Sequence, residues 1–401
     1  LGSSTSSKDG GNGGEIQILG GAGRGTSTSV DVGGNVIVIA GLSDGATGGE
    51  IEVASGYSSA SSSGSIKIHS ANAGASGISG SVDVHTGSAS NGKSGAFSVS
   101  SGTATSGSGG SITMSVGSGN SGSGGMLRLV AGSIVGNDGD QSGGVVKVSS
   151  GHAQSTSSGN IIMNTANAGA AGVSGRISIF SGFSTLGPSG NIEVVTGDSQ
   201  KNAGGVIVHA GYTTKSYGGK ISLNAGKTLD EDGALGGEIK IFSGWSEKTT
   251  SGKIHMYTAN SGGNGASGEI SLYTGTASAG ESGAIGIKSG SADNGHGGYI
   301  NISVGTSNID GKGSGGDLWL SAGNTENENE VGGIVRILAG NGTSEEDGSG
   351  GRIVLQGGHG VGKDPDSYGG DLGMFAGNAI AGTGGSIEIA SGHGKLHSSG
   401  S

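Results

Sequence analysis

The stretch Gly48-Gly49-Glu50-Ile51-Glu52-Val53-Ala54-Ser55-Gly56 decides the fold that this sequence predicts. Its two large apolar side chains, Ile51 and Val53, are two residues apart, which is the period of an extended strand with one face toward a core. The same phrase returns 24 times, mostly at a spacing of 15 residues. The chain is therefore one short unit repeated, a pattern typical of solenoid proteins.

Each unit is numbered from the small residue that opens it, so that Gly48 is position 1 and Gly56 is position 9. Positions 4 and 6 are apolar in every unit, whereas position 5 between them is mixed and includes Glu52, Lys67 and Asp83. We therefore expect positions 4 and 6 to point inward and position 5 to point outward. Position 8 is nearly always small, and position 9 is usually Gly, which we expect to supply a positive φ at a corner.

The unit lengths indicate how many units form one coil. When they are grouped in threes from residue 13, the third unit is almost always short and the long units recur at fixed places. Three similar stretches, 70–74, 165–169 and 258–262, lie six units apart. We therefore predict an all-β protein: a triangular parallel β-solenoid, or β-helix, with three strands per coil and about eight coils. The alternative is a flat solenoid with one 15-residue unit per coil.

The repeat also sets the expected domain organisation. Residues 1–12 form an N-terminal lead-in, residues 13–398 a single solenoid of 24 strand-turn units, and residues 399–401 the start of a further coil. An uncapped solenoid end exposes unpaired backbone edges and apolar core. We therefore expect each end to stack on a further coil, so that the chain assembles with itself end to end.

Composition and charge exclude several classes of protein. Glycine occupies 96 of the 401 positions and proline only 2, so the chain is neither collagen nor a proline-rich linker. The formal net charge is −11 without any basic run, which disfavours nucleic acid and anionic membranes as partners. No apolar stretch approaches the ~20 residues that span a bilayer, so we expect no membrane span. The chain has no cysteine, so disulfides contribute nothing.

Acidic residues gather between the predicted strands, and carboxylates with glycine turns are the ingredients of a Ca²⁺ site. Three such groups belong to the second units of alternate triplets, so we expect them to rise along one edge as an acidic ridge. The candidate metal ligands are Asp138, Asp140, Asp230, Glu231, Asp232, Glu326, Glu328 and Glu330. The competing interpretation is a solvated loop surface without metal, and calcium is the only cofactor considered.

Two further kinds of surface site are predicted. Some large apolar residues fall on outward positions of the second unit in each triplet, where a file of them indicates a buried lateral contact. These residues are Ile37, Ile39, Val130, Phe180, Tyr273, Trp319 and Phe375. The sequon Asn341-Gly342-Thr343 lies in a predicted loop and would accept an N-glycan in a secreted protein.

The sequence does not favour catalysis. β-Helical polysaccharide lyases cluster Asp, Arg or Lys on one face, and the repeat shows no such cluster. Residues 87–94 fit the P-loop pattern, but a true P-loop leads into a helix, whereas here another strand-like unit follows. We therefore interpret that match as chance and expect no enzyme.

Units of the form Gly-Gly-x-Ile-x-Ile-x-Ser-Gly, for example residues 236–244, resemble Gly/Ser-rich repeat proteins of marine algae and similar organisms. The resemblance covers nearly the whole chain from Gly13 onward. It implies a secreted or cell-surface protein with a structural role.

Three functions follow as hypotheses. The first is a non-enzymatic structural β-solenoid, a self-assembling segment of an extracellular fibre or surface scaffold. The second is an adhesin or binding module that uses the acidic loops to contact mineral, glycan or calcium. The third is a carbohydrate-active β-helix enzyme.

Overall fold

A computed structural model describes most of the chain. The described residues are 13–27, 29–136, 142–229, 233–263, 265–307 and 314–393. These ranges contain no helix and no β-strand. The prediction of an all-β triangular parallel β-solenoid with three strands per coil is therefore wrong. The flat solenoid is wrong for the same reason, because both architectures require strands paired in a ladder.

The alternation of side chains is present, but the backbone pairing is not. Hydrogen bonds join side chains two residues apart, as from Ser81 Oγ to Asp83 Oδ2 at 3.2 Å and from Asn224 Nδ2 to Ser222 Oγ at 3.0 Å. Positions 3, 5 and 7 therefore share one face, as in extended backbone. In contrast, no backbone hydrogen bond among the described residues involves positions 3–8 of any unit. A period of two in the sequence fixes which side chains share a face, and it does not require a ladder.

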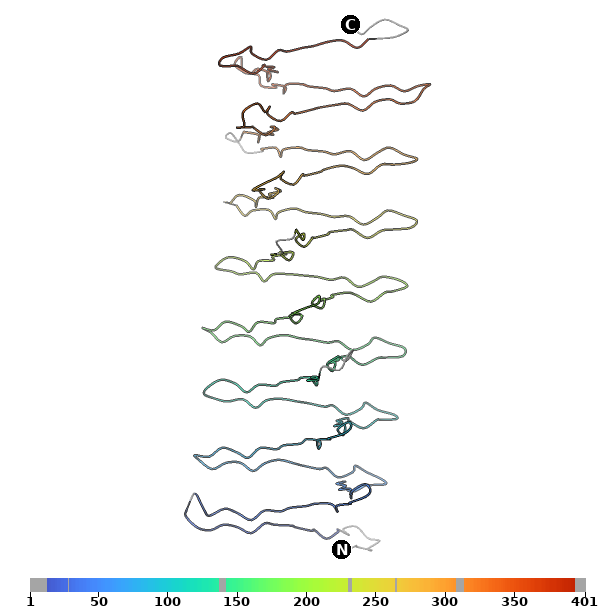
Figure 1. The fold of residues 1–401 in the computed structure, drawn as a ribbon, viewed down its shortest axis with the longest axis vertical. Helices are drawn as coiled ribbons and strands as arrows, with labels where there is room; N and C mark the ends of the chain where they lie inside the picture. The colour runs from blue at the N-terminus through green and yellow to red at the C-terminus, as the bar shows by residue number, and fades with distance from the viewer. Residues whose placement is uncertain are drawn as a thin grey trace. The chain divides into compact units, whose positions relative to one another are not determined.

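The chain divides into two units, Leu1–Gly204 and Gly205–Ser401. Each of them, taken by itself, shows the same local pattern: the backbone runs out, turns and returns as a series of narrow loops (Figure 1). The single repeat region expected at residues 13–398 stays a prediction. The expected lead-in at 1–12 and the expected further coil at 399–401 lie outside the described residues.

Twelve of the loops are closed by a backbone hydrogen bond at a neck, where position 9 of one repeat meets position 2 of the next. In loop 41–49, for example, the backbone N–H of Gly49 donates to the carbonyl oxygen of Gly41 at 2.9 Å. Equivalent bonds close the loops 21–34, 56–64, 132–144, 151–159, 211–219, 226–237, 244–252, 323–333, 340–351, 358–370 and 377–385. The longer repeats therefore gain their extra residues in the loop, and the neck keeps the same chemistry.

Position 8 faces position 2 across the neck, which explains why both are small. A Cβ added to Gly64 would stand 3.3 Å from Ser55 Cβ, and one added to Gly237 would stand 2.9 Å from the backbone nitrogen of Gly226. Contacts under about 3.0 Å are not tolerated by real side chains without movement. At the tightest necks, such as that of Gly237, glycine at position 2 is thus required by close approach of the two sides, whereas at Gly110 or Gly190 an added Cβ would make only ordinary contacts at 3.6 and 4.0 Å.

Hydroxyl groups at position 8 close further necks. Thr196 Oγ1 donates to the carbonyl oxygen of Gly204 at 3.1 Å, and Ser289 Oγ donates to the carbonyl oxygen of Gly298 at 2.8 Å. Thr165 Oγ1 makes the same bond to Gly175 at 3.2 Å. At these three necks, which have no bond between backbone groups, a side chain of position 8 supplies a hydrogen bond across the neck.

The side chains at positions 4 and 6, which the repeat pattern predicts to point inward, are not buried. At position 4 the exposed fraction runs from 47% at Ile353 to 64% at Phe97, with Ile16 at 72%. At position 6 it runs from 55% at Met374 to 83% at Ile389. No hydrophobic residue of the described ranges is buried. The prediction that positions 4 and 6 point into a core is therefore wrong, because without paired strands the chain has no second layer to cover them.

The role predicted for glycine at position 9 is also wrong. The described glycines with positive φ are Gly122, Gly233 and Gly280, and none of them is at position 9. All three lie within loops, where a turn needs the left-handed region. A Cβ added at the position-9 residues Gly41 or Gly226 would meet nothing within 4 Å.

Candidate functional site

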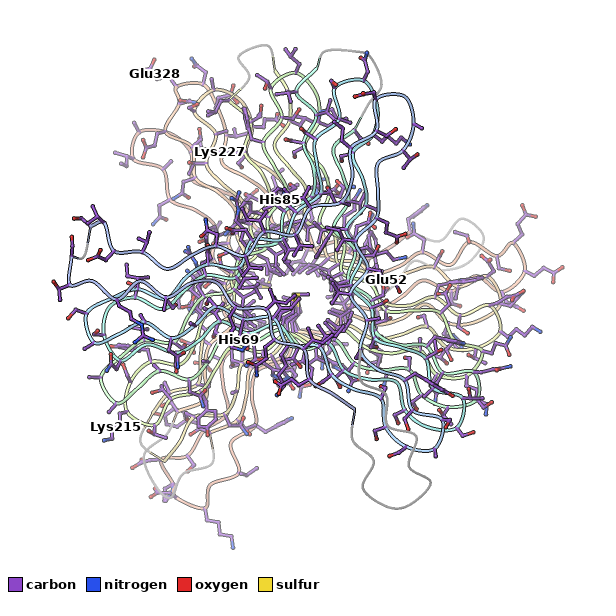
Figure 2. All side chains as sticks on the ribbon, turned by 90° about the horizontal axis from the view of Figure 1, so that it is seen from below. Glu52, His69, His85, Lys215, Lys227 and Glu328 are labelled. Atoms are coloured by element: carbon purple, nitrogen blue, oxygen red, sulfur yellow. The ribbon has the colours of Figure 1, made fainter. Side chains whose placement is uncertain are left out.

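The loops carry many of the charged side chains beyond the necks. Figure 2 places Lys215 and Glu328 toward the outer ends of their loops, whereas Glu52, His69 and His85 lie closer to the loop bases. Glu52 is at position 5 and both histidines are at position 7, so they belong to the odd-numbered face. These five charged groups thus come from five separate repeats.

Serine hydroxyls shape the loop turns. The backbone N–H of Ala46 donates to Ser43 Oγ at 3.1 Å, and that of Ser61 donates to Ser58 Oγ at 3.0 Å. The same three-residue bond joins Gly187 to Ser184 at 3.2 Å. Such local side-chain bonds replace the backbone turn bond and explain the serine content of the loops.

The predicted acidic ridge is only partly described. Asp138, Asp140, Asp230, Glu231 and Asp232 lie outside the described residues. Glu326, Glu328 and Glu330 belong to loop 323–333, which is closed by the bond from Gly333 N to Gly323 O at 2.9 Å.

A turn at Asn329, whose φ is 67°, separates two of these glutamates. Among the described residues no group of three or more His, Cys, Asp or Glu is placed to hold a metal ion. Metal binding at the eight acidic residues stays a prediction.

Other acidic side chains are engaged within their own turns. The backbone N–H of Asp366 donates to Asp364 Oδ1 at 3.0 Å, and that of Ser367 donates to the Asp364 carbonyl at 2.9 Å. Lys240 Nζ lies 2.7 Å from Glu238 Oε2, with both side chains well exposed. An exposed pair of this kind contributes about 0–1 kcal/mol, so it orders the odd-numbered face locally and does not mark a site.

The residues predicted for lateral contact are all exposed. Their exposed fractions run from 68% at Val130 to 93% at Phe375. Ile37, Ile39, Phe180, Tyr273 and Trp319 fall between these values. Because positions 4 and 6 are exposed too, exposure does not single these residues out, and the lateral contact stays a prediction.

The sequon residue Asn341 is exposed and directly follows the neck residue Gly340. The neck is closed by the bond from Gly351 N to Gly340 O at 2.8 Å. Glycosylation of Asn341 stays a prediction, at the base of loop 340–351 rather than at its tip.

The feature that sequence reasoning missed is the neck. Its signal was the constant Gly at position 2 paired with the small residue at position 8 of the preceding unit. Periodicity drew attention to positions 4 and 6 instead, whereas the described hydrogen bonds between distant backbone segments join positions 2 and 9.

Comparison with known proteins adds no relative. No protein-family model matches the chain, and neither a curated protein nor a solved structure is significantly similar to it. The described ranges contain no helix with the length and apolar character needed to cross a membrane.

Proposed function

We propose that this chain is a non-enzymatic structural protein, a self-assembling segment of an extracellular fibre or surface scaffold. One observation carries the proposal: the apolar residues that recur at positions 4 and 6 of every repeat remain exposed throughout the described chain. Exposed apolar patches of this extent mark surfaces that associate. The proposal depends on these apolar residues at positions 4 and 6 and not on the chain ends.

The accessible area supports association. A folded monomer of 38.0 kDa exposes about 14,000 Å², and the corresponding unfolded chain about 55,000 Å². This chain exposes 40441 Å². The surplus over a folded monomer is roughly 26,000 Å², whereas a standard protein interface buries only about 1,600 Å². Covering such a surplus takes contacts along the whole length of the chain, as in a fibre.

The repetition supports a structural role over an enzymatic one. Twelve loops share the same backbone-bonded neck, and these loops differ mainly in length and in the side chains at their turns. A catalytic site needs unlike groups that converge within hydrogen-bond reach of one substrate. A fibre needs the opposite, namely one contact repeated along the chain. Location outside the cell is part of the proposal because of the Gly/Ser-rich repeat itself.

The test replaces apolar residues of the two faces in the same repeats. The first variant carries Ile161→Asn and Ile192→Asn at position 4, and the matched control carries Ile162→Asn and Val195→Asn at positions 5 and 7. All four residues are exposed, so neither variant disturbs a buried core. Assembly is measured by sedimentation velocity over a range of concentrations and by electron microscopy.

We expect the wild-type chain to form large elongated particles, the position-4 variant to need a concentration at least tenfold higher, and the control to assemble nearly as well as wild type. A wild-type chain that stays monomeric at all concentrations contradicts the proposal. Equal losses in both variants would contradict the assignment of the contact to position 4, and a larger loss in the control would place it on the odd-numbered face.

A further inference from the structure

We infer that copies of this chain pair through the extended segments at positions 3–8, in parallel and in register, so that each segment lies against the same segment of the next copy. This inference rests on the proposed self-assembly and specifies its contact. The chain alone contains no strand in its described ranges, so the pairing in question forms only between chains.

The backbone of these segments offers many groups without a backbone partner, although the position-8 carbonyls of Ser70, Thr86 and Thr165 bond to the side chain of the preceding residue. In the described repeats the backbone bonds close necks and turns, and they leave the N–H and C=O groups of positions 3–8 without backbone partners. An extended segment with free edges is a template for another extended segment, since added backbone satisfies both donors and acceptors. A folded globular partner can supply such a row only at a short exposed sheet edge, which would match one of the 24 segments and leave the others without partners.

The side chains of the same segments require an apolar partner. Position 4 is about half exposed, as at Ile66 with 50% and Ile300 with 50%, and position 6 is more exposed. Side chains of alternate residues lie on one face, so a second extended segment placed alongside continues the same apolar column. The occupant must therefore be extended and must alternate apolar and polar residues with a period of two.

A second copy of this chain fits this description along its whole length. It carries the same 24 segments, separated by the same loops. The surplus of exposed area, roughly 26,000 Å², also exceeds what any single compact partner would cover. Stacking of identical copies covers both edges of each segment and leaves the loops free at the outside.

The loop lengths specify the register. Short loops such as 41–49 and 56–64 alternate irregularly with long ones such as 132–144 and 358–370. Pairing shifted by one repeat would set a long loop against a short one, and antiparallel pairing would reverse their order. Only the parallel in-register arrangement places every loop beside one of its own length.

Charge gives an independent consequence of this register. Each charged residue at position 5, such as Lys67, Asp83 or Arg128, would lie beside its own copy. Like charges directly opposite one another are destabilising, and salt screens exposed charges over about 10 Å at 0.1 M. In-register assembly must therefore be promoted by salt.

The test uses the absence of cysteine from the natural chain. Thr113→Cys and Ser98→Cys each place one thiol at position 5 of neighbouring repeats, on exposed residues away from the necks. Adjacent parallel strands lie about 4.8 Å apart, which is within the Cα separation that a disulfide spans. Assemblies of each variant, and a mixture of both carrying different mass tags, are oxidised and analysed by mass spectrometry.

We expect linkage of residue 113 to 113 and of 98 to 98, with at least tenfold less linkage of 98 to 113, and faster assembly at 0.5 M than at 0.05 M salt. Assembly without same-residue linkage, or with linkage mainly between 98 and 113, overturns the inference while the proposed function stands. A chain that does not assemble under any of these conditions overturns both.

Discussion

The necks and the tips of the loops obey different rules. At a neck, two backbone segments approach until the N–H of position 2 reaches the carbonyl of position 9, as between Gly237 and Gly226 at 2.8 Å. At a tip, turns are held by local hydroxyl bonds, as between Ser246 and Thr249, and the number of residues varies. The residue types are therefore constrained at the necks, where two backbone segments meet. The number of residues can vary at the loop tips, where they do not meet.

Within one neck, the two glycines differ in how much space they leave for a side chain. A Cβ on Gly237 would stand 2.9 Å from the Gly226 nitrogen and 3.1 Å from its oxygen, whereas a Cβ on Gly226 would meet nothing within 4 Å. Two residues joined by one hydrogen bond thus have unequal tolerance to substitution. The largest effect is expected from this inequality.

Gly237→Ala should open its neck, because the atoms it would strike belong to backbone that cannot rotate away. Overpacking of this kind costs about 1–3 kcal/mol. The matched variant Gly226→Ala should be neutral or stabilising by about 0.4–1 kcal/mol, since it restricts the unfolded chain at a position with ordinary φ.

Amide hydrogen exchange at residue 237, measured at one protein concentration, reports the opening of the neck directly. Exchange should accelerate at least fivefold in Gly237→Ala and stay unchanged in Gly226→Ala. Equal acceleration in both variants would show that alanine is tolerated equally at position 2 and at position 9 of the neck.

Gly125→Ala should also be destabilising, but here the added Cβ would meet a side chain, and a second substitution can relieve the clash. Its Cβ would stand 2.6 Å from Cγ1 of Val116, the residue at position 8 across the neck. Adding Val116→Ala removes the obstructing methyl groups and should restore most of the stability, so the two changes are coupled by about 1 kcal/mol. Denaturant unfolding of the two single variants and the double variant measures this coupling. Additive losses would mean that the two side chains do not meet.

Thr196→Val should weaken its neck modestly. It keeps the shape of the side chain but removes the hydroxyl that donates to the Gly204 carbonyl at 3.1 Å. An intramolecular hydrogen bond contributes about 0.5–1.5 kcal/mol, and the exposure of this one places it at the lower end. The control Thr196→Ser keeps the hydroxyl and should behave like wild type in the same unfolding experiment. A loss as large in Thr196→Ser would assign the effect to packing of the methyl group.

The necks also show how far the sequence can be read. The period of two correctly predicts that Ser81 and Asp83 share a face, because side-chain direction follows from the local backbone alone. The pairing of segments and the burial of Ile51 or Val53 could not be predicted in the same way, since both depend on what lies beside the segment. The same limit applies to position 9, where the glycine-rich pattern suggested a positive φ that the structure does not have.

The candidate site was still harder to predict. The acidic residues Glu326, Glu328 and Glu330 are close in sequence, but closeness in sequence within a loop does not make a set of converging ligands. Position 2 and position 8 were visible as constant small residues, and their meaning lay in a contact between consecutive repeats. Repeats within one chain reveal a contact only when both partners are considered together.

The smallest effect is expected at the tips. Inserting Gly-Ser after Ser43, within loop 41–49, lengthens a loop whose neck stays closed by the Gly49 to Gly41 bond. Doubling a flexible loop costs only about 0.6 kcal/mol, so two added residues should change the free energy of unfolding by less than that. The matched control inserts a single Gly between Glu52 and Val53, which moves Val53 to the other face of its segment. The tip insertion should assemble like wild type and the control should lose assembly, as judged by sedimentation. A tip insertion that disrupts assembly as strongly as the control would remove the distinction between neck and tip on which all four predictions depend.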